Sequence, residues 1–559
     1  MEKPKQMETV MIDDMRDYVR KHGKLIPMSM IAAAICFGFL VFCGNIRIDT
    51  EELMNHPGSK LGWLTIGRFG LAFLKSILGL DTHNVIKSGI LFFLFFVIGA
   101  NLMTFAIYHF SGKKAYPYWI FLMLYVTSNI WSYQIYFSVQ QAEIACAMLL
   151  LVVAALLSVQ AFFEKHGMAS ICRVILTVAL LVLGLGTYQA LAAYYIAVCI
   201  IFFLAWTDNT SVFADKQVDA SERKWNRKTI CGITGVIVTF GVAYVFYRVI
   251  ANTWFMTTAD YMEGQMGWGR YPAIDCIKNV LRTAKNLLLG VGPRNFSFYA
   301  IGLLLSAALV VIWWRELPKE EKNMRFWLRV LAIVGLAVSP FLMTLYMGEM
   351  LVTRSQFALP VVAAFLGMYA LDGVCSRLAD KMSQEQPGGG RRAWGRWIST
   401  LCSVCVLLTI AVQCGYNIRL AYTDEQRFIG DAAKTETLLA MLREENGGEL
   451  PTQPIVFVGY QEADMPDWCR RTEMYGWSFY EWDYSAENST GATHRIVGFA
   501  QAYAGCALNE DASEEERQQA VSLAETLSDF PADGSIAVTD DIVVVRLSEV
   551  CERAALDWW

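Results

Sequence analysis

Long apolar runs alternate with short charged segments over the first three quarters of the chain. In lipid such runs form helices, because a helix satisfies its own backbone hydrogen bonds and about 20 apolar residues cross the hydrocarbon core. The pattern predicts an α-helical polytopic membrane protein with about 11 transmembrane helices. We expect them near residues 27–44, 85–109, 117–135, 140–163, 171–187, 188–206, 229–251, 296–314, 326–347, 356–374 and 397–415. The third run begins near Pro117 and ends in Ser128 and Asn129, which predicts a short or broken helix.

The same pattern divides the chain into three parts. Residues 1–26 carry apolar residues at helical spacing and predict a cytoplasmic amphipathic helix. Residues 27–415 form the transmembrane domain, with large loops at 45–84 and 252–295, and the segment from Leu61 to Leu80 predicts one helix in the membrane interface. The first apolar run is expected to stay as a span, because a long polar segment precedes it and no cleavage pattern closes it.

Residues 416–559 change character and predict a small extracytoplasmic α/β domain. We expect a helix at 425–445, a buried strand at 454–459, helices near 493–506 and 513–528, and a strand pair at 535–539 and 542–547. The charged helices at 425–445 and 513–528 are typical of solvated surfaces. No glycine-rich phosphate loop follows the strand at 454–459, so nothing there indicates nucleotide binding.

Lys and Arg set the expected orientation. They gather in the N-terminal segment and in every second loop, and in short loops this bias marks the cytoplasmic side of a plasma membrane. The loops 45–84 and 252–295 and the segment 416–559 then lie outside. We therefore expect a multi-pass protein of a bacterial plasma membrane.

Composition removes some functions from consideration. The chain has a net charge of −5 and is 55% hydrophobic, without a basic patch in a soluble part, which argues against nucleic acid as a partner. Most of the 14 cysteines lie inside apolar runs. The spacing of Cys276, Cys469, Cys506 and Cys551 indicates neither a metal site nor an obligatory disulfide.

Three carboxylates follow the first span directly, and they are Asp49, Glu51 and Glu52. Acids within one helical turn of a membrane surface are costly unless they serve a purpose, so each is a candidate catalytic base. The simpler interpretation is a solvated loop whose acids cap a helix. Arg68 and Arg354 lie at the membrane rim, where an arginine either binds a phosphate or extends its charged head to water.

Aromatic and amide side chains are dense in the same outer loops. Candidates for contact with substrate are Trp63, Tyr133, Gln134, Gln140, Glu143, Tyr188, Gln189 and Trp268. Aromatic residues also form ordinary interfacial belts, and amides also join neighbouring helices, so both alternatives stay open. The lone histidines His56 and His83 have no second ligand at metal spacing.

The runs IDTEELMNHP and GWLTIGRFGL resemble the opening of the Gtr type-II glucosyl transferase family. The likeness extends to SYQIYFSVQQAE, GTYQA, MGEMLVTRSQFALP and GSIAVTDDIVVVRLS. The resemblance implies a GT-C-like membrane enzyme that moves a hexose, glucose by family, from a polyprenyl-phosphate carrier to a surface glycan. It also implies that the acid after the first span, here Asp49, is the base, although Glu51 or Glu52 could share or take the role.

The expected partners are membrane lipids, a lipid-linked sugar donor and a glycan acceptor. No cofactor is expected with certainty, and the absence of a paired-aspartate motif makes a divalent metal doubtful. Two other functions fit a polytopic protein with an outer domain. A lipid or glycan flippase would place charges deep in spans, and a scaffold would bind wall glycan through residues 417–559.

Overall fold

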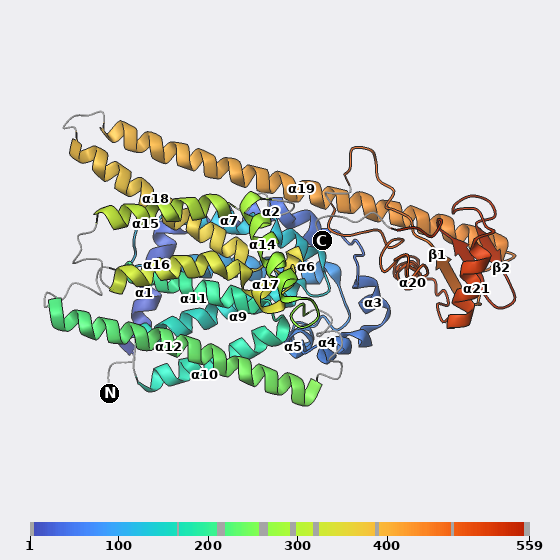
Figure 1. The fold of residues 1–559 in the computed structure, drawn as a ribbon, viewed down its shortest axis with the longest axis horizontal. Coiled ribbons are helices and arrows are strands. Elements are labelled where there is room, and N and C mark those ends of the chain that lie inside the picture. Colours follow the sequence, from blue (N-terminus) through green and yellow to red (C-terminus); the bar gives the residue numbers. More distant parts are fainter. Residues whose placement is uncertain are drawn as a thin grey trace.

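The computed structural model describes residues 5–164, 167–209, 218–255, 266–290, 298–316, 324–385, 391–470 and 474–552. Most of these residues are helical, and the helices form a bundle at one end of an elongated molecule (Figure 1). The long helices of the bundle are α2 (Leu25–Phe42), α6 (Val85–Phe110), α9 (Gln141–Val159), α10 (Met168–Thr187), α11 (Leu191–Thr207), α12 (Val218–Ile250), α15 (Tyr299–Glu316), α16 (Met324–Val338), α18 (Ala358–Glu385) and α19 (Arg391–Glu445).

The remaining helices of the described ranges that precede the C-terminal segment connect them or lie at the ends of the bundle. They are α1 (Lys5–His22), α3 (Thr50–Asn55), η1 (Pro57–Leu61), α4 (Gly62–Thr65), α5 (Phe69–Ile77), α7 (Tyr118–Val126), α8 (Ile130–Tyr136), η2 (Gln160–Glu164), η4 (Ala251–Phe255), α14 (Ala273–Leu289), η7 (Ser339–Phe341), α17 (Leu342–Met347) and η8 (Thr353–Ser355).

Nine helical segments of the described ranges are long and apolar enough to cross a membrane. They are Leu25–Phe42, Val85–Phe110, Gln141–Glu164, Met168–Thr187, Asn226–Phe255, Tyr299–Glu316, Met324–Met347, Ala358–Arg377 and Thr400–Glu445. Helix α11 is also apolar but has 17 residues. The protein is therefore a helical multi-pass membrane protein.

The run at 117–135 is broken, as its sequence predicts, into α7 and α8. The break would leave backbone groups unpaired inside the bundle, where no bulk water can satisfy them. Asn417 Nδ2 donates to the Thr127 carbonyl at 2.9 Å, and the indole of Trp131 donates to the Tyr125 carbonyl at 2.7 Å. These side chains compensate for the missing helical hydrogen bonds.

The separate helix expected at 425–445 is wrong. Helix α19 has 55 residues and runs from Arg391 to Glu445, so the predicted span at 397–415 and the expected helix belong to one element that extends well beyond the bundle (Figure 1). The solvated surface expected for 425–445 is also wrong in its first turns, because Arg427 and Asp431 are buried. Their charges pair with each other, with 2.7 Å between Arg427 Nη1 and Asp431 Oδ2.

The single interfacial helix expected from Leu61 to Leu80 is also wrong. Helices α4 and α5 are separated at Gly67, whose φ of 75° lies in the left-handed region that favours glycine. Helix α5 then packs against the end of α10 at very short range. A Cβ at Gly70 would lie 2.5 Å from the Leu183 carbonyl oxygen, and one at Gly186 would lie 2.7 Å from the Phe69 ring.

The C-terminal segment carries a small sheet beside α20 (Thr493–Ala504) and α21 (Glu514–Ala524). Strand β3 (Val543–Arg546) lies in the centre, parallel to β1 (Ile455–Val458) and antiparallel to β2 (Ile536–Val538). The elements occur where the sequence predicts them. They lie at the end of the molecule toward which α3 projects (Figure 1).

Candidate functional site

Arg68 and Arg354 both act on the side chain of Tyr188. The Arg68 guanidinium carbon lies 4.5 Å from the centre of the Tyr188 ring, and the Tyr188 hydroxyl shares a 2.7 Å hydrogen bond with Ser355, the neighbour of Arg354. Burial raises the pKa of Tyr188, but the charges of Arg68 and Arg354 outweigh it, and the pKa falls below its usual value. The tyrosine therefore lies in a positive field.

The local fold explains why these residues meet. Arg68 is the N-cap residue of α5, and the close approach at Gly70 and Gly186 brings α5 against the end of α10, directly before Tyr188. Arg354 lies in η8, where its guanidinium carbon is 3.8 Å from the centre of the Phe137 ring. We call Arg68, Arg354, Tyr188 and Phe137 the arginine site.

The arginine site has positive charge without a matching acid. Within the described ranges neither Arg68 nor Arg354 forms an ion pair with a carboxylate, and the Nε atom of each is buried without a hydrogen-bond partner. A buried donor on a charged group normally has a partner, because leaving it unpaired costs about 1–3 kcal/mol or more. An anion such as a phosphate would supply both the negative charge and the acceptors.

Gln134 lies on the same side of α8 as Trp131 and Phe137, the residues of this segment that contact Phe357 and Arg354. Trp131, three residues earlier, packs against Phe357, and Phe137, three residues later, lies beneath Arg354. The Gln134 side chain is 1% exposed, yet neither its amide oxygen nor its amide nitrogen has a hydrogen-bond partner. An amide buried in this way is suited to a ligand that both donates and accepts hydrogen bonds.

The three acids after the first span form a second cluster, which we call the acidic segment (residues 49–52). Asp49 has a φ of 64° and precedes α3, so the chain turns sharply there. The Glu51 side chain is 2% exposed, whereas that of Asp49 is 49% exposed and that of Glu52 is 34% exposed. Asp49 is thus the acid most open to a substrate.

Arg495 and His494 of α20 contact the acidic segment. Arg495 Nη1 lies 2.7 Å from Glu51 Oε1 and 3.2 Å from Asp49 Oδ1, and His494 Nε2 lies 3.4 Å from Glu52 Oε2. Burial raises the pKa of Glu51 to about 7, against the opposing charge of Arg495, and the nearby charge of Asp49 adds to the rise. Glu51 therefore titrates near neutral pH.

Phe137 and Ser138 connect the two clusters. Phe137 lies beneath Arg354, and the Ser138 hydroxyl is 2.9 Å from the hydroxyl of Thr50, which stands between Asp49 and Glu51. Phe137 thus belongs to the arginine site, and its neighbour Ser138 contacts the acidic segment. His83 also lies here, with its Nε2 atom 3.4 Å from Ser138 Oγ. Burial and the charge of Lys75 lower the pKa of His83 to about 3, which keeps the ring neutral.

Two predicted substrate residues are engaged with a buried lysine. The Lys75 ammonium lies 2.7 Å from Glu143 Oε1, and both side chains are fully buried. The same ammonium lies 5.3 Å from the centre of the Trp63 ring. Trp63 and Glu143 therefore both lie near the Lys75 ammonium, which also donates to the carbonyl of Val139, the residue after Ser138.

The other predicted residues lie in different surroundings. Gln189 donates to the Tyr247 hydroxyl at 2.9 Å and so joins the turn between α10 and α11 to α12, which fits the alternative of a hydrogen bond between neighbouring segments that the sequence left open. Tyr133 packs edge-on against Tyr475, and Gln140 is buried at the start of α9. Trp268 is partly exposed and donates to the Leu345 carbonyl at the end of α17. A direct role for these residues stays a prediction.

Arg495, His494 and Ser138 were not predicted as site residues from the sequence. All three are candidates only because they contact residues far away in the chain. The sequence of α20 by itself is that of an ordinary amphipathic helix. No group of three or more His, Cys, Asp and Glu side chains that could hold a metal ion occurs among the residues that the structure describes.

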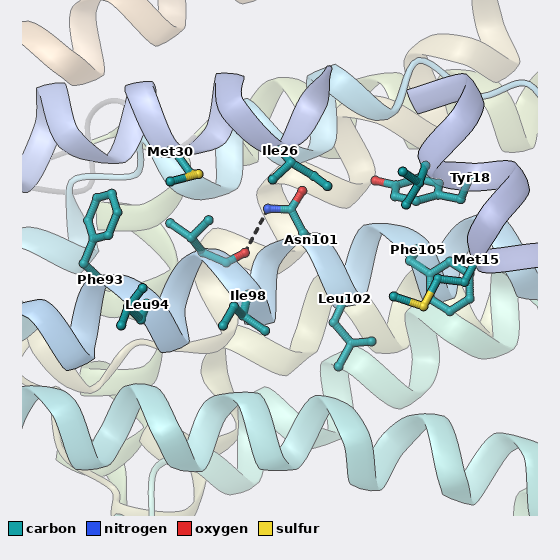
Figure 2. Close-up of a pocket in the computed structure, with 12 residues that line it drawn as sticks. Met15, Tyr18, Ile26, Met30, Phe93, Leu94, Ile98, Asn101, Leu102 and Phe105 are labelled. Atoms are coloured by element: carbon teal, nitrogen blue, oxygen red, sulfur yellow. Dashed lines mark hydrogen bonds between the residues drawn. The ribbon is translucent and has the colours of Figure 1, made fainter. Parts of the chain in front are cut away.

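A separate cavity lies between α1, α2 and α6 (Figure 2). Ile26 and Met30 come from the start of α2, and Leu102 and Phe105 from the second half of α6, so the cavity lies at the far end of both helices from the acidic segment. Its lining is apolar apart from the tips of Asn101 and Tyr18. It offers no charge for a phosphate, and we do not place the reaction there.

The model of one protein family, glucosyl transferase GtrII, matches residues 38–371. The match includes the acidic segment and the whole arginine site, and it ends before α19 and the C-terminal sheet. No curated protein and no solved structure matches the chain in the same comparisons.

Proposed function

Because the chain belongs to the glucosyl transferase GtrII family, we propose that it transfers glucose from a polyprenyl-phosphate carrier to a glycan of the cell envelope. Membership of the family supports the activity of a glucosyltransferase. The carrier and the class of acceptor are our proposal. The distribution of Lys and Arg favours the outer membrane face for the reaction. Nucleotide sugars are absent from that face, so a lipid-linked donor fits the expected location.

The observation that carries the proposal is the arginine site. Four segments that are distant in sequence bring Arg68, Phe137, Tyr188 and Arg354 together, with two positive charges and no carboxylate partner within the described ranges. A sugar phosphate at the membrane surface requires this kind of site, because charge-assisted hydrogen bonds both bind the phosphate and stabilise it as a leaving group.

Asp49 is the proposed base. In a single displacement the oxygen of the acceptor hydroxyl attacks the anomeric carbon, and the bond between that carbon and the phosphate oxygen breaks. The proton of the hydroxyl passes to the Asp49 carboxylate, and the bonding electron pair leaves with the polyprenyl phosphate, held by Arg68 and Arg354. Such a displacement inverts the configuration at the anomeric carbon. Asp49 suits the role better than Glu51 because its carboxylate is half exposed.

The test uses the full chain in proteoliposomes with polyprenyl phosphate that carries radiolabelled glucose. Envelope membranes of the source cells serve as acceptor, and transfer is the movement of label from the solvent-extractable lipid to the glycan fraction. We expect the wild type to transfer label. Asp49→Asn should lower the rate of transfer by about 1000-fold or more, a reduction typical of removing a catalytic base. Asp529→Asn is the folding control, because Asp529 pairs with Arg546 in the C-terminal segment and does not contact the acidic segment.

Two results would contradict the proposal. If the wild type moves labelled lipid across the bilayer without transferring glucose, the chain is a flippase. If the labelled lipid neither binds nor reacts while residues 417–559 of the full chain are protected by glycan, it is a glycan-binding scaffold.

A further inference from the structure

We propose that Arg495, which lies beyond the region matched by the family model, is a positioning residue that holds Asp49 and Glu51 in the geometry of the reaction. The inference rests on the proposed function. It implies that the C-terminal segment completes the active site instead of only covering it.

Arg495 binds three carboxylates from two parts of the chain. Its Nη1 atom faces both acids of the loop, at 2.7 Å from Glu51 and 3.2 Å from Asp49, and its Nε atom lies 2.6 Å from Asp483. The Arg495 side chain is 16% exposed, so solvent screens these contacts only partly. A planar guanidinium fixes the directions of its donors, which makes it a stronger constraint on orientation than a lysine would be.

Helices α3 and α20 are in close contact at Gly498, three residues after the arginine. A Cβ at Gly498 would lie 3.2 Å from Glu51 Cγ, which shows how closely the two helices pack there. Asn55, at the end of α3, donates to the Gly498 carbonyl at 2.8 Å. These contacts hold α20 at a fixed distance from the acidic segment, and Arg495 is then directed at Asp49 and Glu51 by the fold.

Charge balance explains why a cation is needed here. Asp49, Glu51, Glu52 and Asp483 are acids that lie close together, and Arg495 is the cation that faces them from α20, with His494 beside Glu52. Without Arg495 the carboxylates would repel one another, and Asp49 would turn outward toward water. Because Glu51 and Asp49 contact the same nitrogen, a change in the ionisation of Glu51 also changes how firmly Asp49 is held.

The experiment compares Arg495→Gln and Arg495→Lys with wild type in the transfer assay, over pH 5–9 and over a range of donor concentrations. The matched control is Arg546→Gln. Arg546 also lies in the C-terminal segment and pairs with Asp529 and Glu549, but it does not contact the acidic segment.

For Arg495→Gln we expect kcat to fall about tenfold or more, since misplacing a catalytic group is costly. The donor KM should change little, because the phosphate is held by Arg68 and Arg354. Removing the guanidinium also removes the charge that opposes the high pKa of Glu51, so the acidic limb of the pH profile should move to higher pH. Arg495→Lys should restore the position of the limb but only part of kcat.

A structural role alone predicts a different result. If Arg495→Gln lowers only the amount of folded protein, as Arg546→Gln is expected to do, and leaves kcat per folded molecule and the pH profile unchanged, the inference is wrong. An inactive wild type would instead overturn the proposed function, so the two failures are distinguishable.

Discussion

Arg47 and Asp424 are separated by 377 positions in the sequence and form a buried ion pair, with 3.2 Å between Arg47 Nε and Asp424 Oδ2. Asp424 also accepts a hydrogen bond from Arg427, at 3.2 Å. One carboxylate of α19 therefore contacts two buried guanidinium groups, that of Arg427, which also pairs with Asp431, and that of Arg47, which lies only two residues before Asp49. The pair joins the long helix to the segment that carries the proposed base.

Replacing Asp424 by Asn should strongly destabilise the protein. The change leaves Arg47 and Arg427 buried with less negative charge, and breaking a buried pair from one side typically costs about 3–5 kcal/mol. We expect a clear drop in the thermal unfolding temperature of the protein in detergent. The measurement is size-exclusion chromatography with fluorescence detection after heating. Asp529→Asn removes a partly exposed acid and should cost less than about 1 kcal/mol. Equal stability of the two variants would contradict the proposed importance of the pair.

Neutralising either arginine of the arginine site should weaken donor binding. A charge-assisted hydrogen bond is worth about 1.5–3 kcal/mol, so Arg68→Gln and Arg354→Gln should each raise the Kd for polyprenyl phosphate by about 10-fold to 100-fold. Arg354→Lys keeps the charge but loses the flat contact with Phe137, and should fall between Gln and wild type.

Binding of polyprenyl phosphate to protein in nanodiscs measures this directly, without an acceptor. Arg270→Gln is the control, because Arg270 also lies over an aromatic ring, that of Tyr271, but is exposed. If all three variants bind the lipid as tightly as wild type, the phosphate does not occupy the arginine site.

Glu51 should make stability depend on pH near neutrality. Its pKa in the folded protein, about 7, is higher than the ordinary value of 4.5, so the folded state holds the proton more tightly than the unfolded state. This contribution is fully present below pH 4.5 and is lost as pH rises through 7, with a total of roughly 3 kcal/mol. We expect the unfolding temperature of the wild type to fall between pH 5 and pH 8.

Glu51→Gln should reduce that fall, because glutamine does not ionise in this range. The measurement is the difference in unfolding temperature between the two pH values for each protein, so a general loss of stability in the variant does not affect it. A fall of the same size in both proteins would assign the titration to another group.

The sequence predicts the candidates of the arginine site because a charge beside an apolar run is rare enough to stand out. Arg68 and Arg354 were identified in that way, Tyr188 was a candidate because aromatic and amide side chains are dense in its loop, and Phe137 was not predicted. Their meeting was not predictable, since it depends on the close packing of α5 on α10 at Gly70 and Gly186. Periodicity from Leu61 to Leu80 indicates one helix, and only the tertiary contact explains the turn at Gly67.

Long-range pairing accounts for the other differences. In the sequence, Arg427 and Asp431 look like residues of a solvated helix face. The sequence alone does not show that these opposite charges pair and are buried together. Arg495 gives no local sign of its contact with Glu51, which lies 444 positions earlier. The spans and the C-terminal strands were predicted because their signals are local and periodic, whereas these contacts are neither.

Gln134 offers a test that separates function from stability. Both polar atoms of its buried amide lack partners, which costs stability without a ligand, so Gln134→Leu should leave the unfolding temperature unchanged or raise it. If the amide contacts the sugar or the phosphate, the same change should lower kcat/KM for transfer by about tenfold or more. The two measurements should therefore move in opposite directions.

The matched control is Gln413→Leu. Gln413 is equally buried, but its Oε1 accepts a hydrogen bond from Thr127 at 2.6 Å, so its loss should destabilise the protein. Transfer per folded molecule should then change little, since Gln413 lies on α19 beside the break between α7 and α8. If Gln134→Leu destabilises the protein as much as Gln413→Leu does, its amide has a structural partner and does not await a ligand. In that case the substrate is bound by the arginines alone.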